Sequence, residues 1–124
     1  MARLANRHLP ELVTHDRFGH RVDRIDFHPS WHSLMQKCFQ TETHSFAWTA
    51  NKSGGHVARA ALSYLWNQGE NGICCPMGMT FASIAAIRHD PEVAAKWEPI
   101  ILQNDYDARP VHAAEKSGVT VGWR

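Results

Sequence analysis

Hydrophobic residues recur at helical spacing in the stretch that begins at Pro29. A proline fits the first turn of a helix because its missing N–H would have no intrahelical partner there. The apolar positions that follow are spaced i, i+3, i+4, i+7 and i+8, and they are Trp31, Leu34, Met35, Cys38 and Phe39. This pattern predicts an amphipathic helix. A further apolar patch over residues 46–50 either extends this helix or starts another.

A second apolar stripe follows the Gly54-Gly55 pair. We expect it to be the buried face of a second helix that ends near Gln68-Gly69. The stripe contains Val57, Ala58, Ala61, Leu62 and Leu65, and a polar row of Arg59, Ser63 and Asn67 lies opposite. Because few residues join the two helices, we expect them to pack antiparallel.

Two more helices are predicted after an Asn71-Gly72 turn. Pro76 opens the first, which covers residues 77–87 and is apolar around most of its circumference. Asp90-Pro91-Glu92 opens the second with a capping carboxylate, a proline at the first position and an acid in the first turn. The buried stripe of this last helix contains Val93, Ala94, Trp97, Ile100 and Ile101.

The two ends of the chain lack helical periodicity. Residues 2–28 indicate a short turn and then an extended stretch that needs a neighbour to lie against. Residues 119–123 indicate the beginning of a β-strand, which has no partner for its backbone groups. The predicted fold class is therefore all-α, a bundle of about four main helices with a vestigial strand at the C-terminus.

Composition limits the classes of function. The 124 residues have the size of one domain, and 13 Lys and Arg against 12 Asp and Glu give no electrostatic case for nucleic acid. The sequence shows neither a membrane-spanning apolar stretch nor a secretory signal pattern, so we expect a cytoplasmic protein. Cys38, Cys74 and Cys75 are odd in number and two are adjacent, which favours reduced thiols.

Three groups of residues offer chemistry, and each also has a plainer structural interpretation. His28 and His32 have the i, i+4 spacing of a metal pair without a third ligand, and His28 can instead satisfy backbone groups at a helix start. The adjacent cysteines could act as a nucleophile at a helix N-terminus or fill space as buried thiols. Ser53-Gly54-Gly55 could cradle a phosphate or form a turn.

Several segments, taken together, resemble the AidB-like acyl-CoA dehydrogenases, the alkylation-response branch of that family, in order and spacing. They are Arg3-Leu4-Ala5-Asn6, Pro10-Glu11-Leu12, Arg21-Val22-Asp23, Phe27-His28-Pro29-Ser30-Trp31-His32-Ser33-Leu34-Met35-Gln36, Ala47-Trp48, Val57-Ala58-Arg59-Ala60-Ala61, Cys75-Pro76-Met77-Gly78-Met79-Thr80-Phe81-Ala82, Tyr106-Asp107 and Lys116-Ser117-Gly118-Val119-Thr120-Val121-Gly122. Each piece is weak alone, but the ordered series covers residues 3–122 and is specific.

The resemblance implies a helical N-terminal domain that leads into a central β domain, with a C-terminal helical domain that closes the flavin and acyl pocket. It implies FAD-dependent oxidation of an acyl-CoA thioester at its α and β carbons. In that family the helix matching residues 77–87 lines the acyl chain, which makes Met79, Thr80 and Ser83 the candidate substrate-pocket residues. In the structural alternative, Met79 belongs to the core and Thr80 bonds back to its own helix.

The chain departs from the family pattern at both ends. After Gly122, family members continue into a methionine-threonine-glutamate segment that begins flavin binding, whereas this chain has Trp123-Arg124. The catalytic base and the DNA-binding surface belong to the family's C-terminal domain, and members carry a leading helical segment before the matched region. We therefore expect a truncated or frameshifted fragment, with a partial helical domain over residues 1–118 and the truncated start of the β domain over residues 119–124.

The expected function follows from this resemblance. The chain should contribute one wall of an acyl pocket and be inactive alone, with FAD and acyl-CoA used by the complete family and no FAD bound by the fragment. The alternative is a small helical interaction or assembly module, including a homo-oligomer, that uses the apolar surface left uncovered. We expect neither nucleic-acid nor membrane binding.

Overall fold

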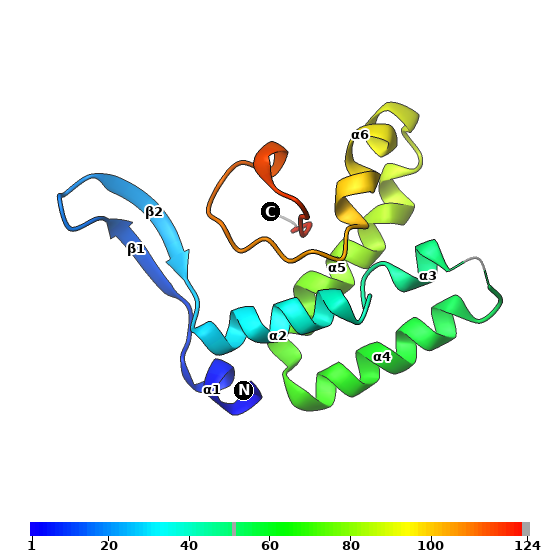
Figure 1. The fold of residues 1–124 in the computed structure, drawn as a ribbon, viewed down its shortest axis with the longest axis horizontal. Helices are drawn as coiled ribbons and strands as arrows, with labels where there is room; N and C mark the ends of the chain where they lie inside the picture. Colours follow the sequence, from blue (N-terminus) through cyan, green and yellow to red (C-terminus); the bar gives the residue numbers. More distant parts are fainter. Residues whose placement is uncertain (51, 123–124) are drawn as a thin grey trace.

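A computed structural model describes residues 1–50 and 52–122 of the chain. Figure 1 shows the elements in order. They are α1 (Ala2–Arg7), β1 (Glu11–His15), β2 (Arg21–Asp26), α2 (Pro29–Gln40), α3 (Phe46–Thr49), α4 (Gly55–Gly69), α5 (Asn71–Ile87), α6 (Pro91–Ile101) and a 3-10 turn, Ala113–Glu115. The four longest helices are those predicted from the sequence, and the predicted all-α class is confirmed. Within the described ranges, each helix is too short or too polar to cross a membrane.

The helix α2 begins where the sequence predicts. His28 lies outside the helix, and its Nδ1 atom accepts the Ser30 N–H at 3.1 Å, which is the plainer of the two interpretations of this histidine. The apolar face of α2 packs against the first turns of α5 in a buried cluster made of Met35, Cys38, Phe39, Ile73 and Met77. The apolar patch that follows α2 forms the separate short helix α3.

The helix α5 begins five residues earlier than predicted. The sequence prediction opened it at Pro76 after an Asn71-Gly72 turn, but Asn71 is already helical and Pro76 lies inside the helix. The cap is Glu70, whose Oε1 atom accepts the Gly72 N–H at 2.7 Å. This carboxylate supports a helix start that the turn-forming residues conceal in the sequence.

The face of α4 that packs against the rest of the protein is opposite to the predicted one. Val57 and Leu65, which were assigned to the buried stripe, are 74% and 64% exposed. Arg59, which was assigned to the outer polar row, points inward, with its guanidinium carbon 4.0 Å from the centre of the Phe81 ring. The indole of Trp66 packs against the cluster shared by α2 and α5. A cation–π contact and a large aromatic residue therefore fix this face, rather than the stripe of aliphatic residues.

The arrangement of α4 agrees only in part with the predicted helical pair. α2 and α4 run in opposite directions in Figure 1, as expected. The main packing partners of α4, however, are α3 and α5. The short helix α3 thus separates two elements that the sequence suggested would form a simple hairpin.

The helix α6 begins as predicted and is buried mainly towards its end. The Oδ1 atom of Asp90 accepts the N–H groups of Glu92 and Val93 at 3.0 and 3.2 Å. Val93 is 37% exposed, which contradicts its place in the predicted buried stripe. Ile101 forms a second buried cluster with Ile84 and Val119, against which Trp97 and Ile100 also pack.

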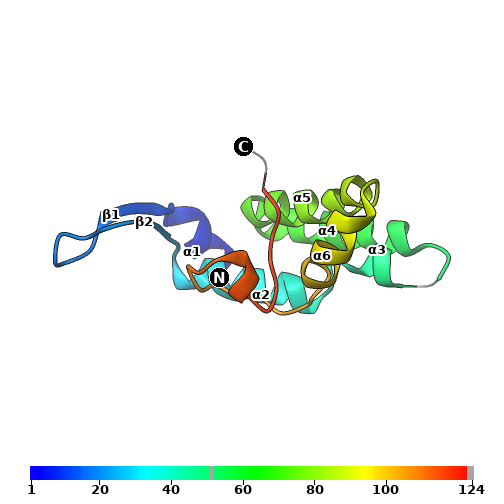
Figure 2. The same ribbon diagram turned by 90° about the horizontal axis from the view of Figure 1, so that it is seen from above.

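The N-terminal region contains the expected turn and extended stretch, the latter as β2, together with α1 and β1, which the sequence analysis did not predict. α1 packs against α2, and β1 pairs antiparallel with β2, with Leu12 opposite Ile25. The register shifts between Val13 and His15, across from Asp23, which has a positive φ of 42°. Figures 1 and 2 show this ribbon projecting from the helices. All six residues of β2 are exposed, so burial could not impose the alternation that reveals a strand.

The C-terminal segment is extended but pairs with no strand over residues 119–122. The Val119 N–H donates to the carbonyl oxygen of Ile100 at 3.4 Å, so α6 takes the place of a neighbouring strand. Val119 and Val121 pack on the second cluster. The predicted strand is thus present only as an extended segment, and Trp123 and Arg124 lie outside the described residues.

A buried polar link joins the turn between α2 and α3 to the end of α6. The Nε2 atom of His44 donates to the carbonyl oxygen of Gln103 at 3.0 Å, and the Ser45 hydroxyl donates to Asn104 Oδ1 at 2.7 Å. His44 and Ser45 are fully buried. The Nδ1 atom of His44 finds no hydrogen-bond partner in the described part of the chain. Burial lowers the pKa of His44, which therefore stays neutral in the core.

Replacing His44 with glutamine should remove part of the pH dependence of stability. Below the ordinary histidine pKa of about 6.5, the unfolded chain binds a proton that the folded chain resists, so the free energy of unfolding falls as the pH falls. Urea titrations between about pH 8 and about pH 5 should show a smaller fall in His44→Gln than in the unaltered chain. His89→Gln, at an exposed histidine, is the control. Identical pH profiles for all three proteins would contradict this assignment.

Candidate functional site

The three residues predicted to line an acyl pocket lie within one turn of α5. Thr80 and Ser83 are on the buried side of the helix, with 0% and 3% of their surface exposed. Met79 is half-buried on the neighbouring face. The structure thus brings the two hydroxyls together and places the thioether beside them.

The Thr80 hydroxyl joins α5 to the C-terminal segment. It donates to the Pro76 carbonyl oxygen at 2.7 Å and accepts the Val121 N–H at 3.0 Å. The first bond is the backbone bond of the structural alternative, and the second connects residues 41 positions apart. Ser83 donates to the Thr80 carbonyl oxygen at 2.8 Å. Both side chains therefore already bond to backbone groups, and they shape this part of the helix.

An apolar strip, here called the α5 stripe, runs along the neighbouring face of the helix. It consists of Cys75, Met79, Ala82 and Ala86, of which Met79 is half-buried and the other three are exposed. The Cys75 thiol lies 3.7 Å from Met79 Sδ, to which it donates. An adaptable thioether beside small residues suits a linear apolar ligand.

Arg59 lies close to this strip without a carboxylate partner among the described residues. A Cβ placed at Gly78 would be 3.9 Å from Arg59 Nη2, so the guanidinium lies over the glycine. Its Nε donates to the Thr43 carbonyl oxygen at 3.3 Å. Burial lowers the pKa of Arg59, although a guanidinium stays charged at neutral pH. The α5 stripe is therefore flanked by a positive charge.

A groove of about 790 Å³ lies between β2, α2, the first turns of α5 and the segment over residues 106–120, and Cys75 at one end of the α5 stripe is part of its lining. Its aromatic lining includes Phe27 and Trp31, which stack with ring centroids 4.9 Å apart. His32 Nδ1 and the Tyr106 hydroxyl are 2.8 Å apart and hydrogen-bonded, and burial raises the pKa of Tyr106. Met79, Thr80 and Ser83 do not line this groove. Sequence reasoning missed it because its lining comes from elements far apart along the chain.

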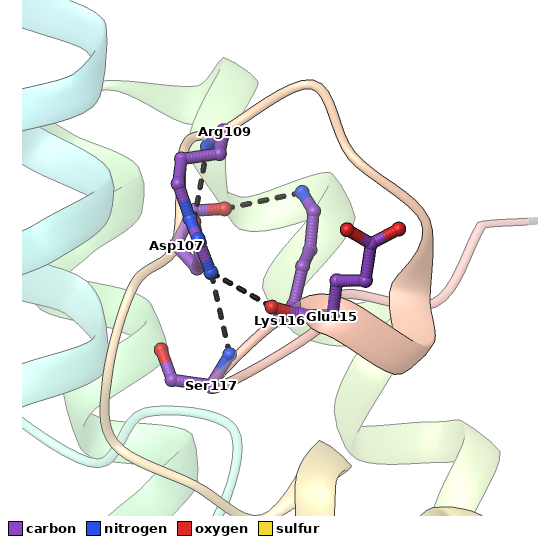
Figure 3. A network of polar contacts seen from close by, with 5 residues as sticks. All are labelled: Asp107, Arg109, Glu115, Lys116 and Ser117. Atoms are coloured by element: carbon purple, nitrogen blue, oxygen red, sulfur yellow. Dashed lines mark hydrogen bonds and ion pairs between the residues drawn. The ribbon is translucent and has the colours of Figure 1, made fainter.

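A polar network fixes the far wall of that groove (Figure 3). The Asp107 carboxylate accepts from the Arg109 guanidinium at 2.6 Å and from the Ser117 N–H at 3.3 Å. The Arg109 guanidinium also donates to the Glu115 carbonyl oxygen at 2.8 Å. The Arg109 side chain holds the pKa of Asp107 well below its usual range. The loop over residues 107–117 is thus closed by an ionised carboxylate.

Two of the three thiols, those of Cys38 and Cys74, do not have the surroundings of a nucleophile. Burial raises the pKa of Cys38 to about 11 and also raises the pKa of Cys74, which favours the protonated form of both. Cys38, Cys74 and Cys75 all carry free thiols. Cys74 lies half-buried inside α5 and donates to the Glu70 carbonyl oxygen at 3.7 Å. These features agree with the space-filling interpretation for Cys74, whereas Cys75 is exposed, which contradicts its interpretation as a buried thiol.

The other candidates from the sequence, a glycine pair and two histidines, have structural roles. Gly54 has a positive φ of 87°. Gly55 is buried, and a Cβ added there would lie 3.5 Å from Ala47 Cα. This pair therefore makes a close turn between α3 and α4. His28 caps α2, while His32 bonds to Tyr106. Over residues 1–50 and 52–122, no group of three or more His, Cys, Asp or Glu side chains is arranged to hold a metal ion.

Solved structures share this fold. "Bd2924 apo-form" matches with a TM-score of 0.76 and 25% identity, over 84% of this chain and 21% of that one. "Crystal Structure of Caenorhabditis elegans ACDH-11 in complex with C11-CoA" matches with a TM-score of 0.74 and 22% identity, over 84% of this chain and 19% of that one. The chain therefore shares its fold with a part of each of these two larger proteins.

The family model "Adaptive response protein AidB N-terminal domain" matches residues 1–108, and the chain belongs to this family. It is 38% identical over 124 residues to the Escherichia coli (strain K12) protein named "Putative acyl-CoA dehydrogenase AidB". That alignment covers 98% of this chain and 23% of the relative, so the chain spans less than a quarter of the relative's length. The resemblance that we drew from the ordered segments is confirmed.

Replacing Thr80 with valine should release the C-terminal segment while preserving side-chain shape. The change leaves the part-buried Val121 N–H without its acceptor, which should lower the free energy of unfolding by about 1–3 kcal/mol. Amide exchange at Val121, measured by NMR, should become faster. Thr49→Val removes a similar backbone bond, to the Ser45 carbonyl oxygen, at an exposed residue and should change stability by less than about 0.5 kcal/mol. Unchanged exchange at Val121 in Thr80→Val would show that this hydroxyl does not hold the segment.

Proposed function

We propose that this chain supplies one wall of the acyl-chain pocket of a FAD-dependent acyl-CoA dehydrogenase, which oxidises an acyl-CoA thioester at its α and β carbons. The α5 stripe is the observation that carries this proposal. Membership of the AidB N-terminal family and identity to a protein named as an acyl-CoA dehydrogenase support the class of enzyme. One of the matched structures is a complex with C11-CoA, which supports acyl-CoA as the ligand class.

In this proposal the three candidate residues have different roles. Met79 contacts the methylene groups of the acyl chain directly, since each buried CH₂ contributes about 0.8 kcal/mol and a thioether adapts to its position. Thr80 and Ser83 act indirectly, because their hydroxyls bond to backbone groups and fix the wall. Ala82 and Ala86 add only a methyl group each and leave room for the chain.

The hydride-accepting chemistry would come from FAD, and two observations support the proposal that other segments supply its site and the catalytic base. The glycine pair before α4 packs against Ala47 as a turn. The α5 stripe contains no carboxylate to act as a base. We therefore propose that the chain alone neither binds FAD nor oxidises acyl-CoA, and that other segments supply both functions. Cytoplasmic location and the absence of nucleic-acid binding stay predictions.

A second candidate function is a helical interaction module. One observation favours it, namely that α4 turns its aliphatic stripe outward, with Val57, Tyr64 and Leu65 each more than half exposed. This function does not exclude the first, because α4 and α5 offer separate surfaces.

A chimera can test the acyl-wall proposal, with this chain replacing the aligned region of the Escherichia coli relative. Met79→Trp should obstruct the wall, so that affinity for long-chain acyl-CoA, followed by flavin absorbance, falls by about tenfold or more while short-chain acyl-CoA is less affected. Ala95→Trp, at an exposed position of α6, should leave the chain-length profile unchanged.

The controls separate misfolding from a change in the pocket. FAD content and circular dichroism should match among the chimeras. The unfused chain, titrated with FAD and acyl-CoA, should leave the flavin spectrum unperturbed. The same chain-length profile in Met79→Trp and the unaltered chimera would refute the assignment of the wall to α5.

A further inference from the structure

Arg59 is a half-buried positive charge beside the proposed acyl wall. Every other arginine that the structure describes is exposed. Ion pairs with carboxylates are made by Arg21, Arg24, Arg88 and Arg109, whereas Arg59 has no such partner among the described residues. Removing a charge from water costs free energy that a carboxylate usually offsets. The lack of this compensation in a partly buried place makes Arg59 a candidate for binding an anionic group.

Three contacts within the chain hold the Arg59 guanidinium in position. Its Nε atom donates to the Thr43 carbonyl oxygen, and its central carbon lies over the Phe81 ring. Its Nη2 atom lies beside Gly78, where the lack of a side chain leaves room for it. Neither Nη atom donates a hydrogen bond to a residue that the structure describes. The outer edge of the guanidinium is therefore held in place and available, so binding an anion there orders few further groups.

The guanidinium lies at one edge of the α5 stripe rather than on it. Gly78 comes three positions after Cys75 and four before Ala82, so it neighbours both stripe residues on the surface of the helix. Thr80 and Ser83 are buried on the other side of the stripe, where the Thr80 hydroxyl holds the C-terminal segment. An apolar chain lying on the stripe would thus have a positive charge along one edge.

The available edge of Arg59 suits a carboxylate. The planar N–H fork of an arginine matches the two oxygens of a carboxylate and binds them through parallel hydrogen bonds. An acyl chain that ends in a carboxylate can place that group beside Gly78 while its methylene groups stay on the α5 stripe. A methyl group in the same place would displace water from the guanidinium without replacing the lost hydrogen bonds. The site should therefore distinguish the two kinds of chain end.

We propose that Arg59 makes the acyl wall selective for acyl-CoA thioesters whose acyl chain ends in a carboxylate, that is, for mono-CoA thioesters of dicarboxylic acids. This inference rests on the proposed function, because it requires the acyl chain to lie on the α5 stripe. It adds a specificity-determining residue from α4, which the sequence analysis had assigned to an outer polar row.

Binding to the FAD-containing chimera tests this selectivity. Thioesters of equal chain length are compared through the flavin absorbance, adipyl-CoA with hexanoyl-CoA and suberyl-CoA with octanoyl-CoA. At least one dicarboxylic thioester should bind about tenfold or more tightly than its partner, because hydrogen bonds to charged groups contribute that much. Arg59→Gln should abolish the preference, and Arg59→Lys, which keeps the charge but not the fork, should retain part of it. Arg17→Gln, at an exposed position of the hairpin loop, should keep the preference in full.

Two results would overturn the proposal. The first is equal affinity for both members of each pair in the unaltered chimera. The second is an Arg59→Gln variant that weakens both members equally, because the guanidinium would then serve a CoA phosphate or a carboxylate from another segment, and thioesters of dephospho-CoA would separate these two cases. FAD content and circular dichroism should match among the variants, which excludes misfolding.

Failure of the acyl wall itself would give a different result. Met79→Trp would then leave the chain-length profile of the monocarboxylic thioesters unchanged, whatever the effect of Arg59→Gln. A profile that changes in Met79→Trp, together with no preference for a dicarboxylic thioester, would retain the wall and reject only the role of Arg59.

Discussion

The bond between the Thr80 hydroxyl and the Val121 N–H holds the C-terminal segment against the central helix. Thr80 is fully buried and also donates to Pro76, so its hydroxyl serves a helix and a distant segment at once. The cluster of Ile84, Ile101 and Val119 is completed by the segment fixed in this way. Without the bond, the part-buried N–H of Val121 would lose its partner beside the second apolar cluster.

This constraint also determines which part of α5 can meet a ligand. The side of α5 that carries Thr80 and Ser83 is occupied by protein, while the α5 stripe beside it carries Met79 at the surface. α5 packs against α2, α4 and α6, so this stripe belongs to the most enclosed helix of the domain. A rigid wall formed in this way can define the path of an acyl chain without using a polar group on it.

Local signals allowed much of the helical fold to be predicted from sequence. His28-Pro29 and Asp90-Pro91 cap α2 and α6 through neighbouring backbone groups, so both starts could be found. Interactions with distant residues explain the errors: the contact of Arg59 with Phe81 turns α4 around. In the exposed hairpin only the extended stretch of β2 was expected; β1 and its pairing with β2 could not be predicted, since burial selected no clear alternation.

The candidate site, like the fold, could be predicted only in part. Family resemblance supplied Met79, Thr80 and Ser83, and general helix chemistry suggested the bond from Thr80 to its own helix. The bond to Val121 could not be predicted, because it joins residues 41 positions apart. The aromatic groove was missed for the same reason, since Trp31 and Tyr106 meet only in the folded chain.

The most direct test of the acyl wall is photolabelling of the FAD-containing chimera by an acyl-CoA with a diazirine at the end of its chain. Mass spectrometry of the digested protein would locate the label. The account predicts labelling in the α5 stripe, at Met79 or its neighbours on that face. Labelling concentrated at Trp31 and Tyr106, in the aromatic groove, would contradict it.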